Sequence, residues 1–260
     1  FGKHLVEVMK SFGVATKWMI QDETNFTTFA FVSLMENGER DFYFNRGADG
    51  QLNLQEVEHI DLDEFSIIHF GSATGFLPGP LQAAYQGLLQ KALQRNIFIS
   101  FDPNYRHLLF KNDRQSFIDQ SWNFLERCHF FKVSDEEAML ITGAPTLNEA
   151  AAILLEKTTA IFAITLGKEG TMLGLKGKTM IIDSIPVKPV DTTGAGDAFV
   201  GAILYQLQVL ADHRHMTMFT ELDEKDWHTI IRNANKAGAR TCEYLGAMEA
   251  FKHLSSDIFK

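Results

Sequence analysis

A regular alternation of short apolar runs with amphipathic segments, which begins near residue 60, constrains the fold more than any other feature of the chain. The apolar runs have the length of buried strands and occupy Phe65–Phe70, Ile97–Phe101, Phe130–Val133 and Ala160–Leu166. Segments with helical periodicity separate them, at Leu81–Gln94, Arg114–Glu126, Glu136–Thr142 and Leu147–Lys157. Strands that alternate with helices at this spacing predict right-handed βαβ units. We therefore expect an α/β protein with a mainly parallel central sheet.

Other elements flank this alternation. A helix is expected at Phe1–Phe12, and the β-branched and aromatic segments Thr27–Leu34 and Arg40–Phe44 predict a strand pair joined by Asn37-Gly38, a strong hairpin signal. This pair reads as a small β flap, or lid, over about residues 26–48. A second hairpin is expected over Thr171–Ile185, and two late helices over Gly196–Leu210 and Glu224–Glu243. The 260 residues suffice for a single domain spanning 1–260.

Composition excludes several functions. The net charge of -9 argues against nucleic-acid and anionic-membrane partners, because both require a basic surface. Apolar runs such as Ala150–Leu155 are far too short to span a bilayer. Two cysteines, Cys128 and Cys242, rule out a disulfide scaffold and favour a reducing compartment, which predicts a cytoplasmic location.

The most specific segment is the nonapeptide DTTGAGDAF at Asp191–Phe199. Its small residues allow backbone N–H groups to point toward one spot at the start of an apolar helix, where the helix dipole also favours an anion. Asp197 places a carboxylate beside this anion hole. A base next to an anion hole is the arrangement that phosphoryl transfer to an alcohol requires. The simpler alternative is a tight loop in which Asp197 only complements the dipole.

This string closely resembles the C-terminal signature of the ribokinase-like (PfkB) carbohydrate kinases. The resemblance implies a three-layer α/β/α sandwich and transfer of the γ-phosphate of ATP, with Mg²⁺, to a sugar hydroxyl. It gives the role of catalytic base to Asp197, and makes Gly194, Ala195 and Gly196 the anion hole. Asp191 and the carbonyl of Thr193 would help to hold a monovalent cation such as K⁺.

Further segments resemble the nucleotide side of that family. Thr165 and Gly167 match its T-x-G phosphate loop, although a simple strand-to-turn bend explains them equally well. Ser134–Glu137 aligns with the N-x-x-E motif, with Ser134 in place of the asparagine, so the resemblance implies that Glu137 would act indirectly on Mg²⁺. The resemblance adds Lys132, Ser134, Asn235 and Gly246 to the ATP site. A serine-capped helix start is the alternative for Ser134–Glu137.

The sugar side is suggested by two segments. Asp102–Arg106 (DPNYR) resembles the D-x-N-x-R segment of fructokinases and ketodeoxygluconate kinases, which makes Asn104 and Arg106 candidate substrate contacts. An arginine there can also hold phosphate oxygens with two hydrogen bonds. Arg46 follows the flap and is a candidate sugar contact carried by the flap.

We expect D-fructose as the substrate, with 2-keto-3-deoxygluconate or another sugar as the alternative, and a homodimer paired through the flaps. The family normally begins with a strand and a glycine-rich motif that precede the segment resembling Phe1-Gly2-Lys3, so we expect about a fifth of a typical member to be missing before Phe1. A non-catalytic sugar-binding regulator on the same fold is the second alternative. A dinucleotide-binding oxidoreductase is disfavoured because no G-x-G-x-x-G follows an early strand.

Overall fold

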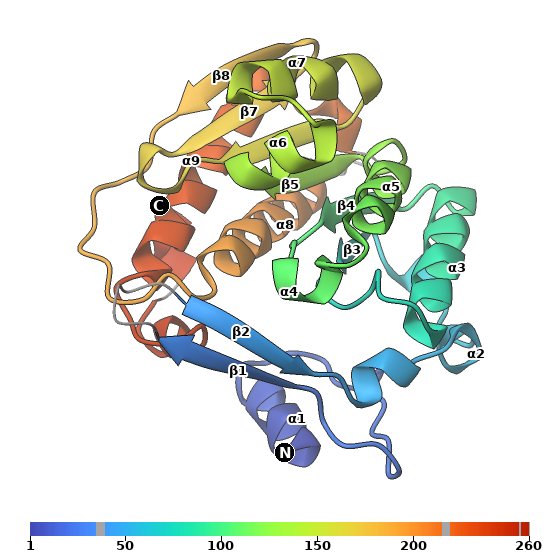
Figure 1. Cartoon of the computed structure of the whole chain (residues 1–260). Coiled ribbons are helices and arrows are strands. Elements are labelled where there is room, and N and C mark those ends of the chain that lie inside the picture. Colours follow the sequence, from blue (N-terminus) through green and yellow to red (C-terminus); the bar gives the residue numbers. More distant parts are fainter. Residues whose placement is uncertain (35–39, 215–218, 255, 260) are drawn as a thin grey trace.

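A six-stranded sheet forms the centre of the protein in the computed structural model, which describes residues 1–34, 40–214, 219–254 and 256–259 (Figure 1). Its strand order follows the chain, with β3 (Ile67–Gly71), β4 (Phe98–Asp102), β5 (Phe130–Ser134), β6 (Ile161–Thr165), β7 (Thr171–Leu175) and β8 (Lys178–Ile182). Strands β3 to β6 are parallel, and β7 and β8 are added antiparallel as a hairpin. The expected mainly parallel α/β sheet is confirmed.

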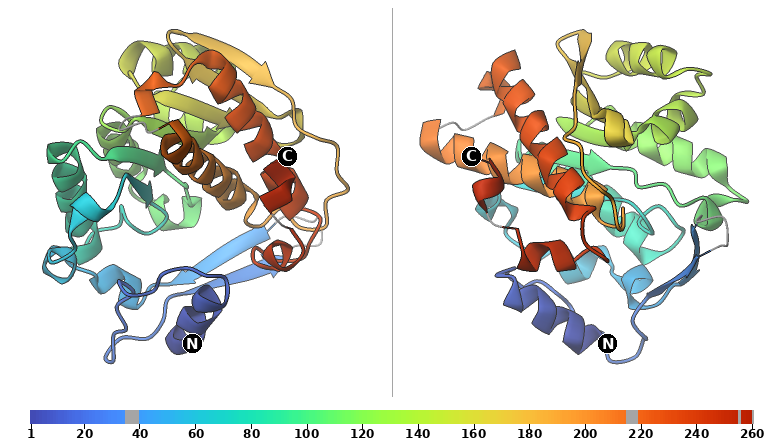
Figure 2. Two further views of the ribbon diagram at one scale, coloured as in Figure 1. Left: turned by 180° about the vertical axis from the view of Figure 1, so that it is seen from behind. Right: turned by 90° about the vertical axis from the view of Figure 1, so that its left-hand side faces the viewer.

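Helices cover both faces of this sheet, as the views in Figure 2 show. One face packs against α3 (Pro80–Gln94), α5 (Arg114–Leu125), α6 (Asp135–Thr142) and α7 (Leu147–Lys157). The other face packs against α8 (Ala195–Arg214) and α9 (Glu224–Thr241). The remaining helices with α geometry are α1 (Gly2–Ser11), α2 (Leu54–Val57) and α4 (His107–Phe110). Helices α2 and α4 were not expected, because four residues are too few to show a period.

The strand pleat divides the core between the two helical layers. Phe101 and Phe131 are neighbours on β4 and β5 and pack on the α5 side, in a cluster rich in phenylalanine. Phe130, one residue earlier, points to the other face and stacks on Trp227 of α9 with ring centroids 5.7 Å apart. Successive side chains of a strand point to opposite faces, so Lys132, two residues after Phe130, lies on the same face of the sheet as Phe130. Its ammonium is directed toward Gly196 of α8.

A separate two-stranded antiparallel sheet forms the flap from β1 (Phe29–Leu34) and β2 (Arg40–Asn45), with Phe29 opposite Asn45. Both strands are confirmed, whereas the predicted turn at Asn37-Gly38 lies outside the described residues. Figure 1 shows the flap apart from the main sheet, with α1 on its far side. The flap therefore joins the body through the polypeptide that follows β2 rather than through shared strand pairing.

Within the described residues, no single helix is long and apolar enough to cross a bilayer, and only the bent pair of α6 and α7 meets that test jointly. Both helices bury residues in the core, among them Ala138, Ile141 and Leu154.

Candidate active site

The loop at residues 191–196 is held at the start of α8 by a buried aspartate. Asp191 accepts hydrogen bonds from the backbone N–H of Thr193 at 2.8 Å and of Gly246 at 2.9 Å. Gly194 adopts φ +83°, and a Cβ there would lie only 2.8 Å from the Cβ of Ala247. Only glycine fits such a position without strain. The 191–196 loop is therefore locked onto the 242–247 loop, and Asp197 is left exposed in the first turn of α8.

A cavity of about 660 Å³, which we call the β6–α8 cavity, opens beside this loop. It is lined by Thr165 at the end of β6 and Gly167 just after it, by residues 184–187, and by Ala195, Gly196 and Phe199 of α8. From α9 it receives Asn235, Gly238 and Ala239. Three of the six residues expected to bind ATP, namely Thr165, Gly167 and Asn235, thus meet in one cavity. Gly246 does not line it, and its N–H group is instead engaged by Asp191.

Asn235 builds the wall of this cavity through internal hydrogen bonds. Its Oδ1 accepts from the hydroxyl of Thr171 at 2.6 Å, and its Nδ2 donates to the carbonyls of Ile182 at 2.9 Å and Asp183 at 3.2 Å. The side chain thereby fastens α9 to the ends of β7 and β8. Its polar atoms are used internally, so Asn235 serves as a wall.

A second cavity of about 520 Å³, which we call the β5 cavity, lies at the ends of β4 and β5. Asn104, Arg106, Lys132, Ser134 and Glu137 line it together with Arg114. Residues expected on the sugar side and residues expected on the phosphate side therefore share one wall. Asn104 has φ +50°, and its backbone N–H donates to Asp102 at 3.1 Å, which turns the 103–106 segment sharply away from β4.

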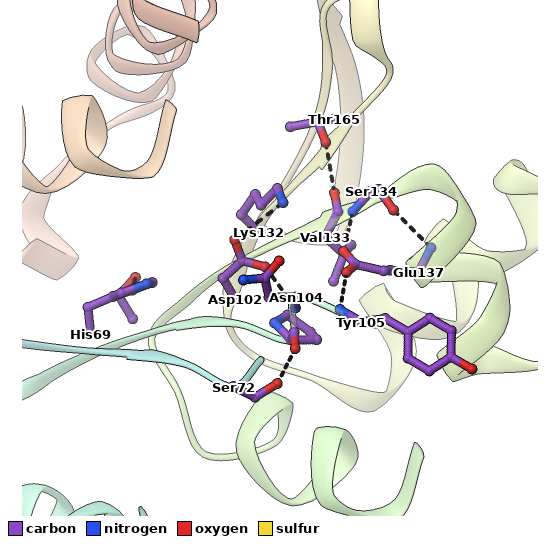
Figure 3. Close-up of polar contacts among 12 residues, drawn as sticks. His69, Ser72, Asp102, Asn104, Tyr105, Lys132, Val133, Ser134, Glu137 and Thr165 are labelled. Atoms are coloured by element: carbon purple, nitrogen blue, oxygen red, sulfur yellow. Dashed lines mark hydrogen bonds and ion pairs between the residues drawn. The ribbon is translucent and has the colours of Figure 1, made fainter. Parts of the chain in front are cut away.

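Glu137 joins the two segments that line the β5 cavity (Figure 3). Its carboxylate accepts from the backbone N–H of Ser134 at 2.8 Å and of Tyr105 at 2.7 Å. The Ser134 hydroxyl in turn accepts from the N–H of Glu137 at 3.1 Å, which completes a capping box at the start of α6. The helix-cap interpretation of Ser134–Glu137 is confirmed. The glutamate also positions the 103–106 segment, which the sequence did not indicate.

A buried ion pair joins Lys132, which was expected in the ATP site, to Asp102, a partner that the sequence did not indicate. Lys132 Nζ lies 3.3 Å from Asp102 Oδ2, and the two side chains are only 10% and 7% exposed. Burial raises the pKa of Asp102 to about 6, with Lys132 opposing the rise and Glu137 adding to it. For Lys132, burial lowers the pKa, but Asp102, Glu137 and Asp197 outweigh that effect and the net pKa is raised. The lysine therefore stays protonated.

His69 of β3 is a second residue that the sequence analysis missed. It lies on the same sheet face as Asp102 and Lys132, and its Nδ1 lies 3.0 Å from the Ser100 hydroxyl. Burial lowers its pKa to about 4, Asp197 partly opposes that shift, and Lys132 adds to it. The imidazole is therefore neutral at pH 7. A lone polar side chain within an apolar strand was the available signal.

Arg46 connects the flap to the body rather than reaching into either cavity. Its guanidinium donates to the carbonyls of Pro78 at 3.1 Å and Thr74 at 3.2 Å, and its Nε lies 3.7 Å from Asp49. Asp49 also accepts from the hydroxyls of Thr28 and Thr74. These contacts anchor the base of the flap, and a sugar contact by Arg46 stays a prediction.

The side chains of the site are compatible with a magnesium ion that is bound mainly by the phosphates of the nucleotide. Within the described residues, no group of three or more histidines, cysteines, aspartates and glutamates is arranged to hold a metal ion. Both oxygens of Glu137 are occupied by backbone N–H groups. Mg²⁺ often keeps several waters and binds mainly through substrate phosphates, which needs no such cage.

The fold and the site together define a phosphotransferase: a three-layer α/β/α domain in which a glycine-containing loop and an exposed carboxylate meet at one helix start, beside a cavity. The sequence matches the pfkB family carbohydrate kinases over residues 1–253, and the chain belongs to that family. Probable fructokinase-4 of Arabidopsis thaliana is 32% identical over 96% of this chain and 75% of its own length.

Solved structures show the same architecture. A fructokinase double mutant from Vibrio cholerae O395, solved with fructose, ADP and potassium ion, superposes with a TM-score of 0.82 at 23% identity, covering 96% of this chain and 78% of that one. An uncharacterized sugar kinase from Pyrococcus horikoshii in complex with ATP has a TM-score of 0.75 at 25% identity, covering 95% and 74%. The ribokinase-like fold expected from the sequence is confirmed.

Proposed function

We propose that the protein transfers the γ-phosphate of ATP to D-fructose and yields fructose 6-phosphate. The observation that carries the proposal is the start of α8, where an exposed Asp197 adjoins the anion hole between the β6–α8 cavity and the β5 cavity. The choice of fructose is supported by relatives named fructokinases in Arabidopsis thaliana and Zea mays.

In this proposal, ATP occupies the β6–α8 cavity with its phosphates directed at the N–H groups of Gly194, Ala195 and Gly196. Asp197 accepts the proton of the acceptor hydroxyl while that oxygen bonds to the γ-phosphorus. The bond from phosphorus to the β–γ bridging oxygen breaks, and its electron pair remains on ADP. Mg²⁺, when bound, neutralises charge on the phosphates. A monovalent cation such as K⁺ would lie near Asp191 and Thr193.

The acceptor binds under the flap in this proposal, near Asn104 and the base of the flap at Arg46. Closure of the flap would exclude water and suppress hydrolysis of ATP. Phe31 and Tyr43 form a cross-strand pair on the flap and are 60% and 62% exposed. This aromatic pair supports a homodimer formed by the flaps. We also place the protein in the cytoplasm, since Cys128 and Cys242 are both free thiols.

The test is a phosphorylation assay with Mg²⁺·ATP and a panel of fructose, 2-keto-3-deoxygluconate, ribose and adenosine. We expect turnover with fructose that falls by about 10³-fold in Asp197→Asn. Turnover confined to 2-keto-3-deoxygluconate would replace the substrate and keep the mechanism. Fructose binding without turnover of any acceptor would favour the non-catalytic sugar-binding alternative, and wild-type rates in Asp197→Asn would refute the base.

A further inference from the structure

The buried pair of Asp102 and Lys132 has no explanation in the packing of the core. Removing two charges from water costs more than their attraction usually returns, so a buried ion pair is weak evidence for stability. Toward α9, the sheet face that carries the pair holds apolar core residues such as Phe130 and Ala163, and the uncharged Thr171, which is hydrogen-bonded to Asn235. The two charged side chains occur only where the strands end beside α8.

Strand pairing determines where the lysine ammonium lies. Phe101 of β4 is paired with Phe131 of β5, so the next residues, Asp102 and Lys132, point together toward the opposite face. A Cβ added at Gly196 would lie 3.3 Å from Lys132 Nζ. The ammonium therefore lies against Gly196 in the first turn of α8.

The same ammonium joins the two cavities. Lys132 lines the β5 cavity, whereas Gly196 lines the β6–α8 cavity. Asp197 lies close enough to Lys132 to help raise its pKa. The Lys132 ammonium thus lies between the two cavities and near Asp197. In the proposed function, the negatively charged phosphoryl group crosses from ATP to the acceptor at this place.

We propose that Lys132 is a catalytic residue that stabilises the phosphoryl group in transfer, and that Asp102 is the positioning residue that keeps the ammonium beside Gly196. The inference rests on the proposed kinase activity. Lys132 keeps its proton throughout: the acceptor proton goes to Asp197, the new oxygen–phosphorus bond forms, and the bond to ADP breaks. The ammonium acts only through its charge and hydrogen bonds.

The first test measures kcat and KM in the full chain for Lys132→Met, Lys132→Arg and Asp102→Asn. We expect Lys132→Met to lower kcat by about 10²- to 10³-fold, with the acceptor KM within about threefold of wild type. Lys132→Arg should recover part of the loss, because it restores the charge. Lys157→Met removes an exposed lysine at the end of α7 and should leave kcat unchanged.

The pH profile separates positioning from structure. Without the Asp102 carboxylate, burial lowers the Lys132 pKa with less opposition, although Glu137 and Asp197 remain to raise it. The other charged or titratable side chains around the β5 cavity are Tyr105, Arg106, Arg114 and Glu136, and His69 lies on the same sheet face. The alkaline fall in kcat should therefore move to lower pH in Asp102→Asn. If the alkaline fall in kcat occurred at the same pH in Asp102→Asn as in wild type, Asp102 would not be a positioning residue for Lys132.

A double variant covers the case in which single variants fold poorly. Asp102→Asn combined with Lys132→Met removes both charges, so its melting temperature should recover toward wild type while kcat stays at the Lys132→Met level. Recovery of both quantities would mean that the pair is structural and would overturn the proposal. Wild-type phosphorylation of the sugar panel is the reference: its absence refutes the kinase assignment, whereas wild-type kcat in Lys132→Met refutes this inference alone.

Discussion

The nucleotide side and the acceptor side of the site are built in different ways. The β6–α8 cavity is walled by core helices and buried hydrogen bonds, such as those of Asn235 and Asp191. The flap instead reaches the body through polar contacts of Arg46, Thr28 and Asp49 at its base, and its aromatic pair Phe31 and Tyr43 faces solvent. In the proposed function, phosphate binding is thus part of the folded core, whereas acceptor binding depends on a separate element.

This difference predicts how stability and activity respond to mutation. Substitutions on the nucleotide side should lower the free energy of unfolding and the turnover together, because the same contacts serve both. Substitutions at the base of the flap should change acceptor binding while the domain stays folded. The predictions below test that division, beginning with the largest effect.

Gly194→Ala should cause the largest loss. The new Cβ combines a left-handed backbone with a contact of 2.8 Å to Ala247, and we expect about 3–4 kcal/mol of lost stability. Turnover should fall by about 100-fold as the anion hole deforms. Gly143→Ala is the control, because Gly143 has φ +73° with nothing within 4 Å of an added Cβ. Denaturant unfolding should show about 1 kcal/mol for this control.

Asn235→Ala should cost about 2–3 kcal/mol, because it leaves the buried hydroxyl of Thr171 and the carbonyl of Ile182 without their partner. The KM for ATP should rise as the cavity wall loosens. Asn233→Ala, two residues earlier, removes one half-buried bond to Gln206 and should cost less than about 1 kcal/mol. Equal losses of stability in the two variants, measured by thermal unfolding, would mean that the hydrogen bonds of Asn235 stabilise the protein no more than the single bond of Asn233 does.

Arg46→Ala tests the acceptor side. The variant loses hydrogen bonds to Pro78 and Thr74, so the flap base should loosen while the core is unchanged. We expect the acceptor KM to rise about 10-fold, with less than about 1 kcal/mol of lost stability. Arg127→Ala, on an exposed turn, is the matched control. If Arg46→Ala unfolded the domain, the separation of the two sides would be wrong.

His69→Gln should have the smallest effect, which appears only in acid. The folded pKa of His69, about 4, lies below its ordinary value of 6.5, so the neutral ring is favoured by folding. This contribution is complete above pH 6.5 and is lost as the pH falls toward 4. The variant should lose less stability on acidification, by at most on the order of 1 kcal/mol, because the ring is partly open to solvent.

The sequence predicted the elements of the fold well, because strand–helix alternation and the DTTGAGDAF string are local signals. Helix α7 matches the expected range, and the hairpin of β7 and β8 turns within the expected segment. The start of α6 also followed from sequence, since Ser134 and Glu137 form a capping box three residues apart.

The contacts of the site could not be predicted in the same way. The pairing of Asp102 with Lys132 depends on the register between β4 and β5, which the residues of neither strand determine alone. The anchoring of Arg46 depends on a loop about 30 residues later in the chain, at Thr74 and Pro78. Local patterns cannot show such partners.

The pleat of β5 has a consequence for how the chain tolerates length changes. Phe130, Phe131 and Lys132 alternate between the α9 side, the phenylalanine-rich side and the α8 side. One residue inserted within β5 ahead of Phe131 would turn the Lys132 ammonium into the phenyl cluster and turn the Phe131 ring toward α8. Insertions in exposed loops are usually tolerated. In β5, by contrast, the protein requires both the types of the residues and their number. Indels should therefore be tolerated at the ends of α7 and rejected inside β5.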